Sequence, residues 1–154
     1  MASCGDMAAI HLLLSAYRIL GPDPDRTTAA TLLGVHGREW TGAARPSRCP
    51  LGPPRACFEN TLHLCVDHPE LTYVEGYAVA GMPLHHAWAV DRSGRVVDTT
   101  WDDPQGRAYF GIPFNTAYAK AAAFESGLYS VLMNWKFQRV LTDAPSKYLS
   151  KTFI

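Results

Sequence analysis

Residues 55–100 carry the pattern that most restricts how this 154-residue chain can fold. From Arg55 to about Asp67 the apolar residues recur at helical spacing, and Pro69 then ends the helix. Three segments rich in β-branched and aromatic residues follow, at residues 71–80, 84–91 and 95–100. Because short turns separate these segments, the sequence predicts a helix followed by an antiparallel β-meander.

Further helices are expected on both sides of this core, which places the chain in the α+β class with extra flanking helices. Helical spacing and capping residues predict them at about residues 6–19, 27–33, 115–126 and 128–135. The break Gly21–Asp25 separates the first two, and Gly34 is expected to stop the second. The length of the chain predicts a single domain over residues 1–154.

Three other segments give weaker patterns. Residues 108–114 are aromatic and broken by Gly111 and Pro113, so they could form a strand or an aromatic wall of a cleft. The tail 136–154 has some β-like content. Residues 36–54 have no periodicity, and long loops of this kind are usually functional or disordered. Because this loop leads to Cys57, we favour a substrate-facing role; a mobile surface loop is the alternative.

Composition and charge exclude several classes of partner. The 14 basic and 14 acidic side chains cancel, so the chain has no broad basic surface for nucleic acid or an anionic membrane. No segment approaches the roughly 18–20 apolar residues of a membrane span, and residues 1–20 do not form a secretory signal. A cytoplasmic location is therefore expected, with four reduced cysteines and no cofactor.

Cys57 is the candidate nucleophile. It is expected in the first turn of the helix that begins near Arg55. The positive end of the helix dipole stabilises a thiolate there, and the unpaired backbone N–H groups can bind an oxyanion. The alternative is a small apolar residue buried at a helix start.

His86 and Asp98 are the candidate base and orienting acid. A carboxylate that holds an imidazole beside a thiol is the standard way to activate a cysteine. Residues of alternate parity point to opposite faces of a strand, so a two-residue turn at Ser93 would put His86 and Asp98 on opposite faces. A loop of three or five residues centred on Arg92 or Ser93 puts them on the same face, and the hypothesis requires it. His85 is then a surface or packing histidine.

Three residues near these positions are candidates for binding substrate. Trp88 and Trp101 could form walls of the site, with core packing as the alternative for each. Asn60, one helical turn after Cys57, could form a hydrogen bond near the site. Its alternatives are a solvated position or a bond to the preceding loop.

Cys57 at a helix start, His86-Ala87-Trp88 on a strand and Asp98-Thr99-Thr100 on the next strand resemble the transglutaminase-like branch of the papain-like cysteine enzymes. The likeness covers about residues 55–101. It implies a papain-like or transglutaminase-like core, with the nucleophile helix packed on the antiparallel meander, and a Cys-His-Asp triad.

Two departures from related motifs stand out. The stretch Cys57–Asn60 is similar to the nucleophile motif of arylamine N-acetyltransferases, but the Arg-Gly-Gly that precedes the cysteine in that family is absent. Papain-type proteases carry a glutamine before the cysteine as an oxyanion donor, and residues 49–56 contain none. The backbone N–H of Cys57 is therefore the one candidate donor that the sequence offers.

The sequence thus predicts a cysteine-dependent hydrolase or acyltransferase that acts on an amide or acyl carbonyl through a thioester at Cys57. A peptidase, an amidase or deamidase and a transglutaminase-like enzyme all fit, with a peptide, a protein or a small acyl or amide compound as substrate. One alternative is a non-catalytic binding module on the same fold. Another is a metal site, although no zinc-finger spacing occurs among the cysteines and histidines at positions 57, 63, 65, 68, 85 and 86. The oligomeric state is not indicated.

Overall fold

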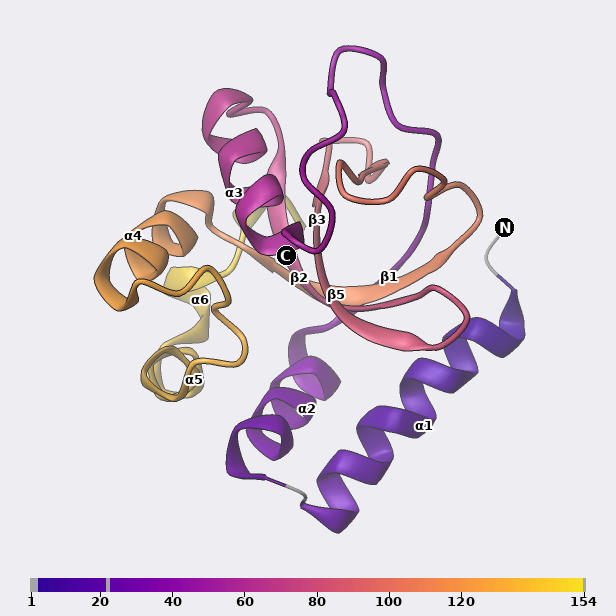
Figure 1. The fold of residues 1–154 in the computed structure, drawn as a ribbon. Coiled ribbons are helices and arrows are strands. Elements are labelled where there is room, and N and C mark those ends of the chain that lie inside the picture. Colours follow the sequence, from indigo (N-terminus) through magenta and orange to yellow (C-terminus); the bar gives the residue numbers. More distant parts are fainter. Residues whose placement is uncertain (1–2, 22, 154) are drawn as a thin grey trace.

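The computed structural model describes residues 3–21 and 23–153, and these form a mixed α+β fold around a curled antiparallel sheet (Figure 1). Pro22 in the predicted break and Ile154 at the end of the predicted tail lie outside the described residues, as do residues 1–2. The strands are β1 (Arg38–Thr41), β2 (Thr72–Val79), β3 (Pro83–Val90), β4 (Val96–Val97) and β5 (Ala108–Phe114). The helices are α1 (Cys4–Leu20), α2 (Pro24–His36), α3 (Cys57–Asp67), α4 (Thr116–Ser126), α5 (Trp135–Asp143) and α6 (Pro145–Tyr148), followed by a 3-10 turn (Lys151–Phe153).

The sheet has the order β1-β5-β2-β3-β4, with every neighbouring pair antiparallel. The predicted meander is confirmed as β2-β3-β4, although β4 is shorter than expected. Residues 108–114 form a strand, and this strand lies between β1 and β2 rather than beside β4. Close approach of the backbones requires Gly76 on β2, because a Cβ there would lie 2.2 Å from the carbonyl oxygen of Phe110.

The turn between β3 and β4 has the odd length that the site hypothesis requires. Val90 pairs with Val96, and the backbone N–H of Asp91 donates to the carbonyl of Arg95 at 3.0 Å. The three residues between them form the loop, and it is centred on Ser93. Even-numbered residues of β3 and β4 therefore share a face of the sheet.

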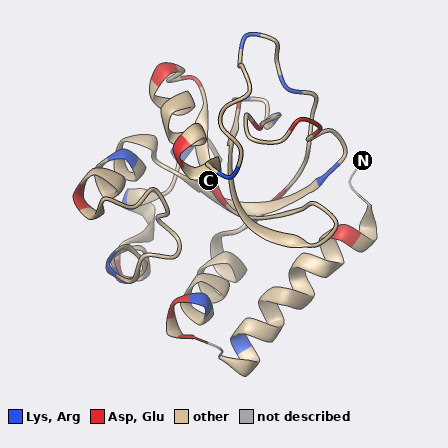
Figure 2. Cartoon of the chain, viewed as in Figure 1, with Lys and Arg blue, Asp and Glu red and all other residues tan. Residues whose placement is uncertain are grey.

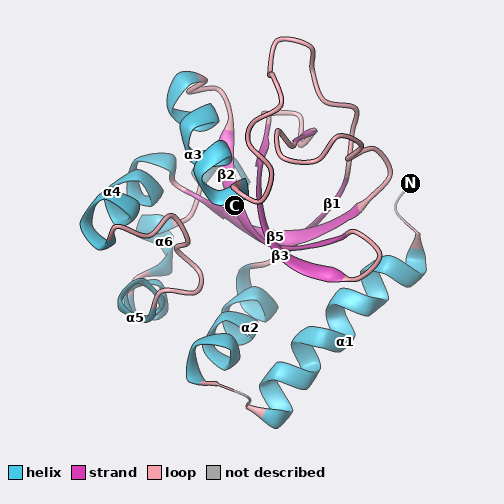
Figure 3. Cartoon of the chain, in the orientation of Figure 1, coloured by secondary structure: helices cyan, strands magenta, loops and turns pink. Residues whose placement is uncertain are grey.

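The two faces of the sheet are buried differently. One face packs against the helices and forms the larger apolar cluster. In Figure 3 the helices lie to the left of and below the sheet while loops lie above it, and α1 and α2 lie side by side in Figure 1. The other face carries a smaller aromatic cluster that includes Trp88 and Tyr109, with Trp40, Trp101 and Phe153 packed against it. The odd-length turn places His86 and Asp98 on this second face.

Charged residues do not gather in one region. Basic and acidic positions are interspersed over the ribbon, in keeping with the net charge of zero (Figure 2). Within residues 3–21 and 23–153, no helix combines the length and the apolar character that crossing a bilayer requires.

Several sequence predictions were wrong. A strand, β1, forms within residues 36–54, because its partner β5 supplies a ladder that a local pattern cannot reveal. The second helix is longer than expected: Asp23 caps it through the N–H of Arg26, and it runs through Gly34 to His36.

The C-terminal predictions also need correction. Residues 128–134 are not helical, because backbone N–H groups of this segment donate to the buried carboxylate of Glu75 instead of to helical carbonyls. Within the tail, residues 135–143 are helical where β-like content was expected, and Leu149 forms an isolated antiparallel bridge with Phe114. Asn134 caps α5, and Phe137 and Leu141, four residues apart, bury one face of it.

Candidate active site

Cys57 is the first residue of α3, as the sequence predicted. The preceding Ala56 offers no side-chain cap, so the N–H groups of the first turn are left to other acceptors. The Cys57 side chain is 7% exposed. A thiol at this position lies in the field of the helix N-terminus, close to the surface.

The loop before Cys57 is fastened to the segment that follows Asp98. The backbone N–H of Gly52 donates to the carbonyl of Thr99 at 2.7 Å. Asn60 donates from its amide nitrogen both to the carbonyl of Pro53, at 2.9 Å, and to Oγ1 of Thr100, at 3.0 Å. These bonds connect the loop, α3 and the end of the meander, and so fix Cys57 relative to Asp98.

His86 and Asp98 meet on the second face of the sheet. Nε2 of His86 lies 2.7 Å from Oδ2 of Asp98, and the two side chains are 3% and 0% exposed. Oδ1 of Asp98 accepts the backbone N–H of Thr100 at 2.9 Å, and Oδ2 also accepts the hydroxyl of Tyr109 at 2.9 Å. The carboxylate is therefore held from three directions, and it fixes the orientation of the imidazole ring.

The pKa values of both groups move in the directions that favour an ion pair. Burial opposes ionisation of Asp98, but its hydrogen bonds, above all that from His86, outweigh burial and lower the pKa of the carboxyl. Burial also opposes protonation of His86. The hydrogen bond with Asp98 and a second one with Cys57 outweigh it and raise the pKa of His86 to about 9. Since Asp98 occupies Nε2, the Cys57 contact falls to Nδ1.

Trp101 covers the His86 ring. The two rings stack with centroids 4.0 Å apart and planes 12° apart. The guanidinium of Arg107 lies over the Trp101 ring, 5.1 Å from its centroid. Trp101 is partly exposed. It therefore shields one side of the imidazole from solvent, while part of its own side chain remains accessible.

The other two predicted substrate-binding residues lie as follows. Trp88 is fully buried and packs edge-on against Trp40 and Tyr109, which is the core-packing alternative. Asn60 uses its amide nitrogen in the two bonds described above, which is the loop-binding alternative. Of the three candidates, Trp101 is the one with a ring both partly exposed and in contact with His86.

A second carboxylate site lies on the opposite face and was not predicted. Glu75 on β2 is fully buried, and Nε2 of His85 lies 3.0 Å from its Oε1. Burial opposes ionisation of Glu75, but the bond from His85 and bonds from Ser130 and Val131 outweigh it and lower the pKa of the carboxyl. His85 also packs against Phe58, with ring centroids 4.8 Å apart, so its packing role is confirmed.

Of the two missed residues, Glu75 and Tyr109, the sequence carried a signal for Glu75. A single carboxylate inside the apolar segment 71–80 has to find partners when the strand is buried, and this marks Glu75. Tyr109 points to the same face of its strand as Gly111 and Pro113. The sequence does not reveal that this strand lies beside β2. The approach of Tyr109 to Asp98 follows only from the order and curl of the sheet.

The remaining cysteines give a contrast to Cys57. Cys65, two turns along α3, is 2% exposed, and burial followed by the charge of Glu70 raises its pKa to about 12. Cys4, Cys49, Cys57 and Cys65 are all free thiols. Over the described part of the chain, no three His, Cys, Asp or Glu side chains converge as a metal site would require.

Comparison with known proteins adds no family to this geometry. No protein-family model, no curated protein and no solved structure matches the chain. The class of the site therefore rests on its own residues: a thiol at the start of α3 and, on the second face of the sheet, an imidazole and a buried carboxylate.

Proposed function

We propose that the chain is a cysteine-dependent hydrolase or acyltransferase with a papain-like or transglutaminase-like core. Cys57 would be the nucleophile, His86 the general acid and base, and Asp98 the residue that orients His86. The substrate would be an amide or acyl carbonyl compound, such as a peptide, a glutamine side chain or a thioester.

One observation carries the proposal: the buried imidazole that lies 2.7 Å from Asp98 also has the Cys57 thiol near enough to raise its pKa. A packing histidine needs no thiol at its second nitrogen. A nucleophile–base–orienter arrangement needs both partners, and it needs them on opposite nitrogens of the ring.

The reaction follows from this geometry. The Cys57 thiolate attacks the carbonyl carbon, and the bond to the leaving amine breaks while the S–acyl bond forms. Protonated His86 donates its proton to the departing nitrogen. Water or an amine then attacks the thioester, His86 takes the proton of that attacking group, and Cys57 is regenerated.

A thiol-alkylating probe tests the proposal. Iodoacetamide at neutral pH should label Cys57 in the native chain, as located by peptide mass spectrometry. Labelling should disappear in Cys57→Ser, fall strongly in His86→Ala and persist in Cys65→Ser. Equal, slow labelling of every cysteine, unchanged in His86→Ala, would refute the proposal. An acyl-enzyme mass with a thioester substrate would extend the result from reactivity to catalysis.

A further inference from the structure

A pocket of about 430 Å³ lies beside the start of α3. Arg55, Ala56 and Phe58, which flank Cys57 in the chain, supply one wall. Residues of the segment 128–134 supply the other. The volume falls within the range of about 300–1,000 Å³ that is usual for sites that bind small ligands.

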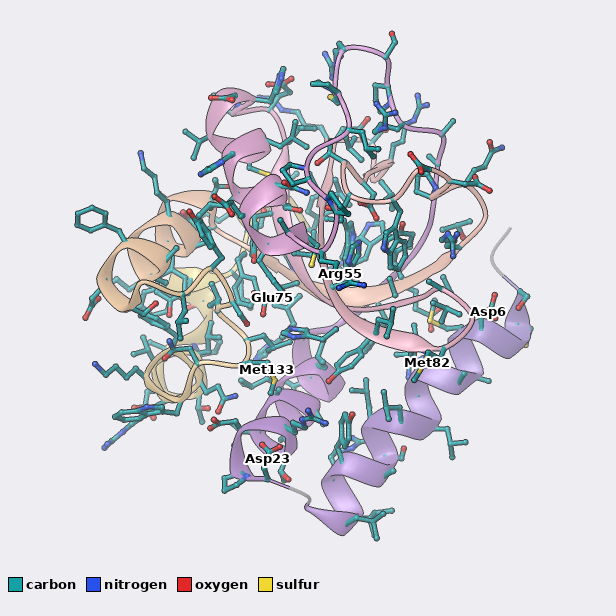
Figure 4. All side chains as sticks on the ribbon, viewed as in Figure 1. Asp6, Asp23, Arg55, Glu75, Met82 and Met133 are labelled. Carbon is teal, nitrogen blue, oxygen red and sulfur yellow. The ribbon has the colours of Figure 1, made fainter. Side chains whose placement is uncertain are left out.

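The second wall is held in place by Glu75. Its carboxylate accepts the hydroxyl of Ser130 at 2.6 Å and the backbone N–H groups of Val131 and Leu132 at 2.8 and 3.0 Å. Three bonds to one buried, ionised group fix a segment that has no regular secondary structure. Figure 4 labels Glu75 and the wall residue Met133 in the same region of the molecule, close to Arg55.

The same network reaches the nucleophile. The hydroxyl of Tyr73 donates to Oε2 of Glu75 at 3.0 Å. Burial and then Glu75 raise the pKa of Tyr73, and Cys57 lies near enough to add to this effect. Cys57 follows Ala56 and precedes Phe58 of the pocket wall, and it influences the pKa of two groups: Tyr73, which supports the Glu75 network, and His86, whose ring Trp101 covers.

Most of the exposed lining of the pocket is apolar, although the polar residues Glu59, Ser130 and Asn134 also line it. Ala56 and Phe58 face it from the helix side, and Leu128 and Met133 face it from the other wall. Such a surface favours a bulky apolar group, and a methionine adapts readily to its shape. At the rim, Arg55 has a φ of 64°, a left-handed conformation that no other described non-glycine residue adopts. Strain of this kind, two residues before the nucleophile, is typical of functional sites.

We propose that this pocket binds a bulky apolar side chain, aromatic or branched aliphatic, on the acyl group that Cys57 accepts. The inference rests on the proposed function and specifies its substrate class. In the acylation step the Cys57 sulfur bonds to the carbonyl carbon of an acyl group with such a side chain. The bond from that carbon to the leaving group breaks, and the leaving group departs with the proton from His86.

Two thioesters with one common leaving thiol test this specificity: those of N-acetylphenylalanine and N-acetylglycine. The rate constant of S-acylation at Cys57, followed by intact mass, should be about tenfold or more higher for the phenylalanine compound. Met133→Trp and Leu128→Trp should fill the pocket and abolish this preference while acylation by the glycine compound continues. Leu128 is 59% exposed, so its variant tests the pocket even if Met133→Trp fails to fold.

Met82→Trp is the matched control, because Met82 lies 61% exposed in the turn between β2 and β3, away from the pocket (Figure 4). The preference of Met82→Trp for the phenylalanine thioester over the glycine thioester should equal that of the native chain. Equal rates for the two thioesters, or a preference that survives in folded Leu128→Trp, would overturn the pocket assignment. Iodoacetamide labelling that still depends on His86 would show that the proposed function survives this failure. Labelling that does not depend on His86 would refute both the pocket assignment and the proposed function.

Discussion

Two neighbouring residues on β3, His85 and His86, each bind a buried carboxylate on opposite faces of the sheet. The distances are 3.0 Å for His85 to Glu75 and 2.7 Å for His86 to Asp98. Both carboxyl groups are fully buried, and in both burial is outweighed by hydrogen bonds that lower the pKa. In distance, burial and the direction of the carboxyl pKa shift, the His85–Glu75 and His86–Asp98 pairs are therefore nearly equivalent.

The difference lies in what else each group contacts. His86 has the Cys57 thiol as its second partner, whereas the ring of His85 packs against those of Phe58 and Tyr77. The other bonds that Glu75 accepts come from the hydroxyl of Tyr73 and from backbone and side-chain groups of residues 130–132. The His85–Glu75 pair therefore holds residues 130–132 in place, whereas in the proposed mechanism the nearby thiol makes the His86–Asp98 pair an activating dyad.

The largest expected effect separates the two histidines. His86→Gln should lower the rate of Cys57 acylation by about 10²–10⁴-fold, because glutamine cannot transfer the proton. His85→Gln retains a hydrogen-bond donor for Glu75 and should leave the rate within a small factor of the native value. Both rates can be measured by intact mass with one thioester. Equal losses in the two variants would contradict the assignment of His86 as the base.

The second prediction separates the two carboxylates by stability. Glu75→Ala should lower the free energy of unfolding by about 3–5 kcal/mol, since it leaves buried donors unpaired around residues 130–132. Asp98→Asn preserves the size of the side chain and should cost less stability, but it should lose most of the acylation activity. Urea unfolding followed by circular dichroism measures the first effect. A larger stability loss in Asp98→Asn than in Glu75→Ala would reverse the comparison.

The third prediction concerns pH. The pKa of His86 in the folded chain is about 9, above its ordinary value of 6.5, so protonation of His86 stabilises the fold. This contribution is complete below pH 6.5 and is lost as the pH rises through 9. The acylation rate with an amide substrate should fall over the same range, as His86 loses the proton that the leaving group needs. Asp98→Asn should move this fall to lower pH; an unchanged profile would argue against the pairing.

The smallest expected effect belongs to Tyr109. Tyr109→Phe removes one hydrogen bond to Asp98, worth about 1–3 kcal/mol, and keeps the ring that packs on Trp88. We expect a modest loss of activity. The pH at which the acylation rate falls on the alkaline side of the profile, its alkaline limb, should also shift slightly downward. That shift, read from a pH–rate profile, distinguishes a positioning role from a purely structural one. Tyr73→Phe, which removes the equivalent bond to Glu75, is the matched control and should leave the limb in place.

Local sequence patterns predicted the parts of the site that depend on single elements. Pro69 and the helical spacing before it gave α3, with Cys57 in its first turn. Alternation along residues 84–91 separated His86 from His85, and the parity argument correctly required an odd turn at Ser93. Each of these features is determined by contacts a few residues apart, which a local pattern records.

Features that depend on distant partners were missed or predicted wrongly. β1 exists because β5 pairs with it, and residues 128–134 stay non-helical because Glu75 binds their N–H groups. Tyr109 reaches Asp98 only because β5 lies beside β2 in a curled sheet. The packed structure pairs residues tens of positions apart, and no pattern within either segment encodes that pairing.

The sequence by itself therefore determined an α+β chain with a thiol at a helix start and an imidazole on a strand; it also predicted the carboxylate on the next strand, whereas Asp98 lies directly after β4. Only the tertiary structure decided that His86 lies 2.7 Å from Asp98 with Cys57 as its other partner, and that His85 serves Glu75 instead. The physical reason is that period-2 alternation assigns a side chain to one of two faces. Which groups that side chain contacts on its face depends on how the strands are ordered and how the loops pack over them.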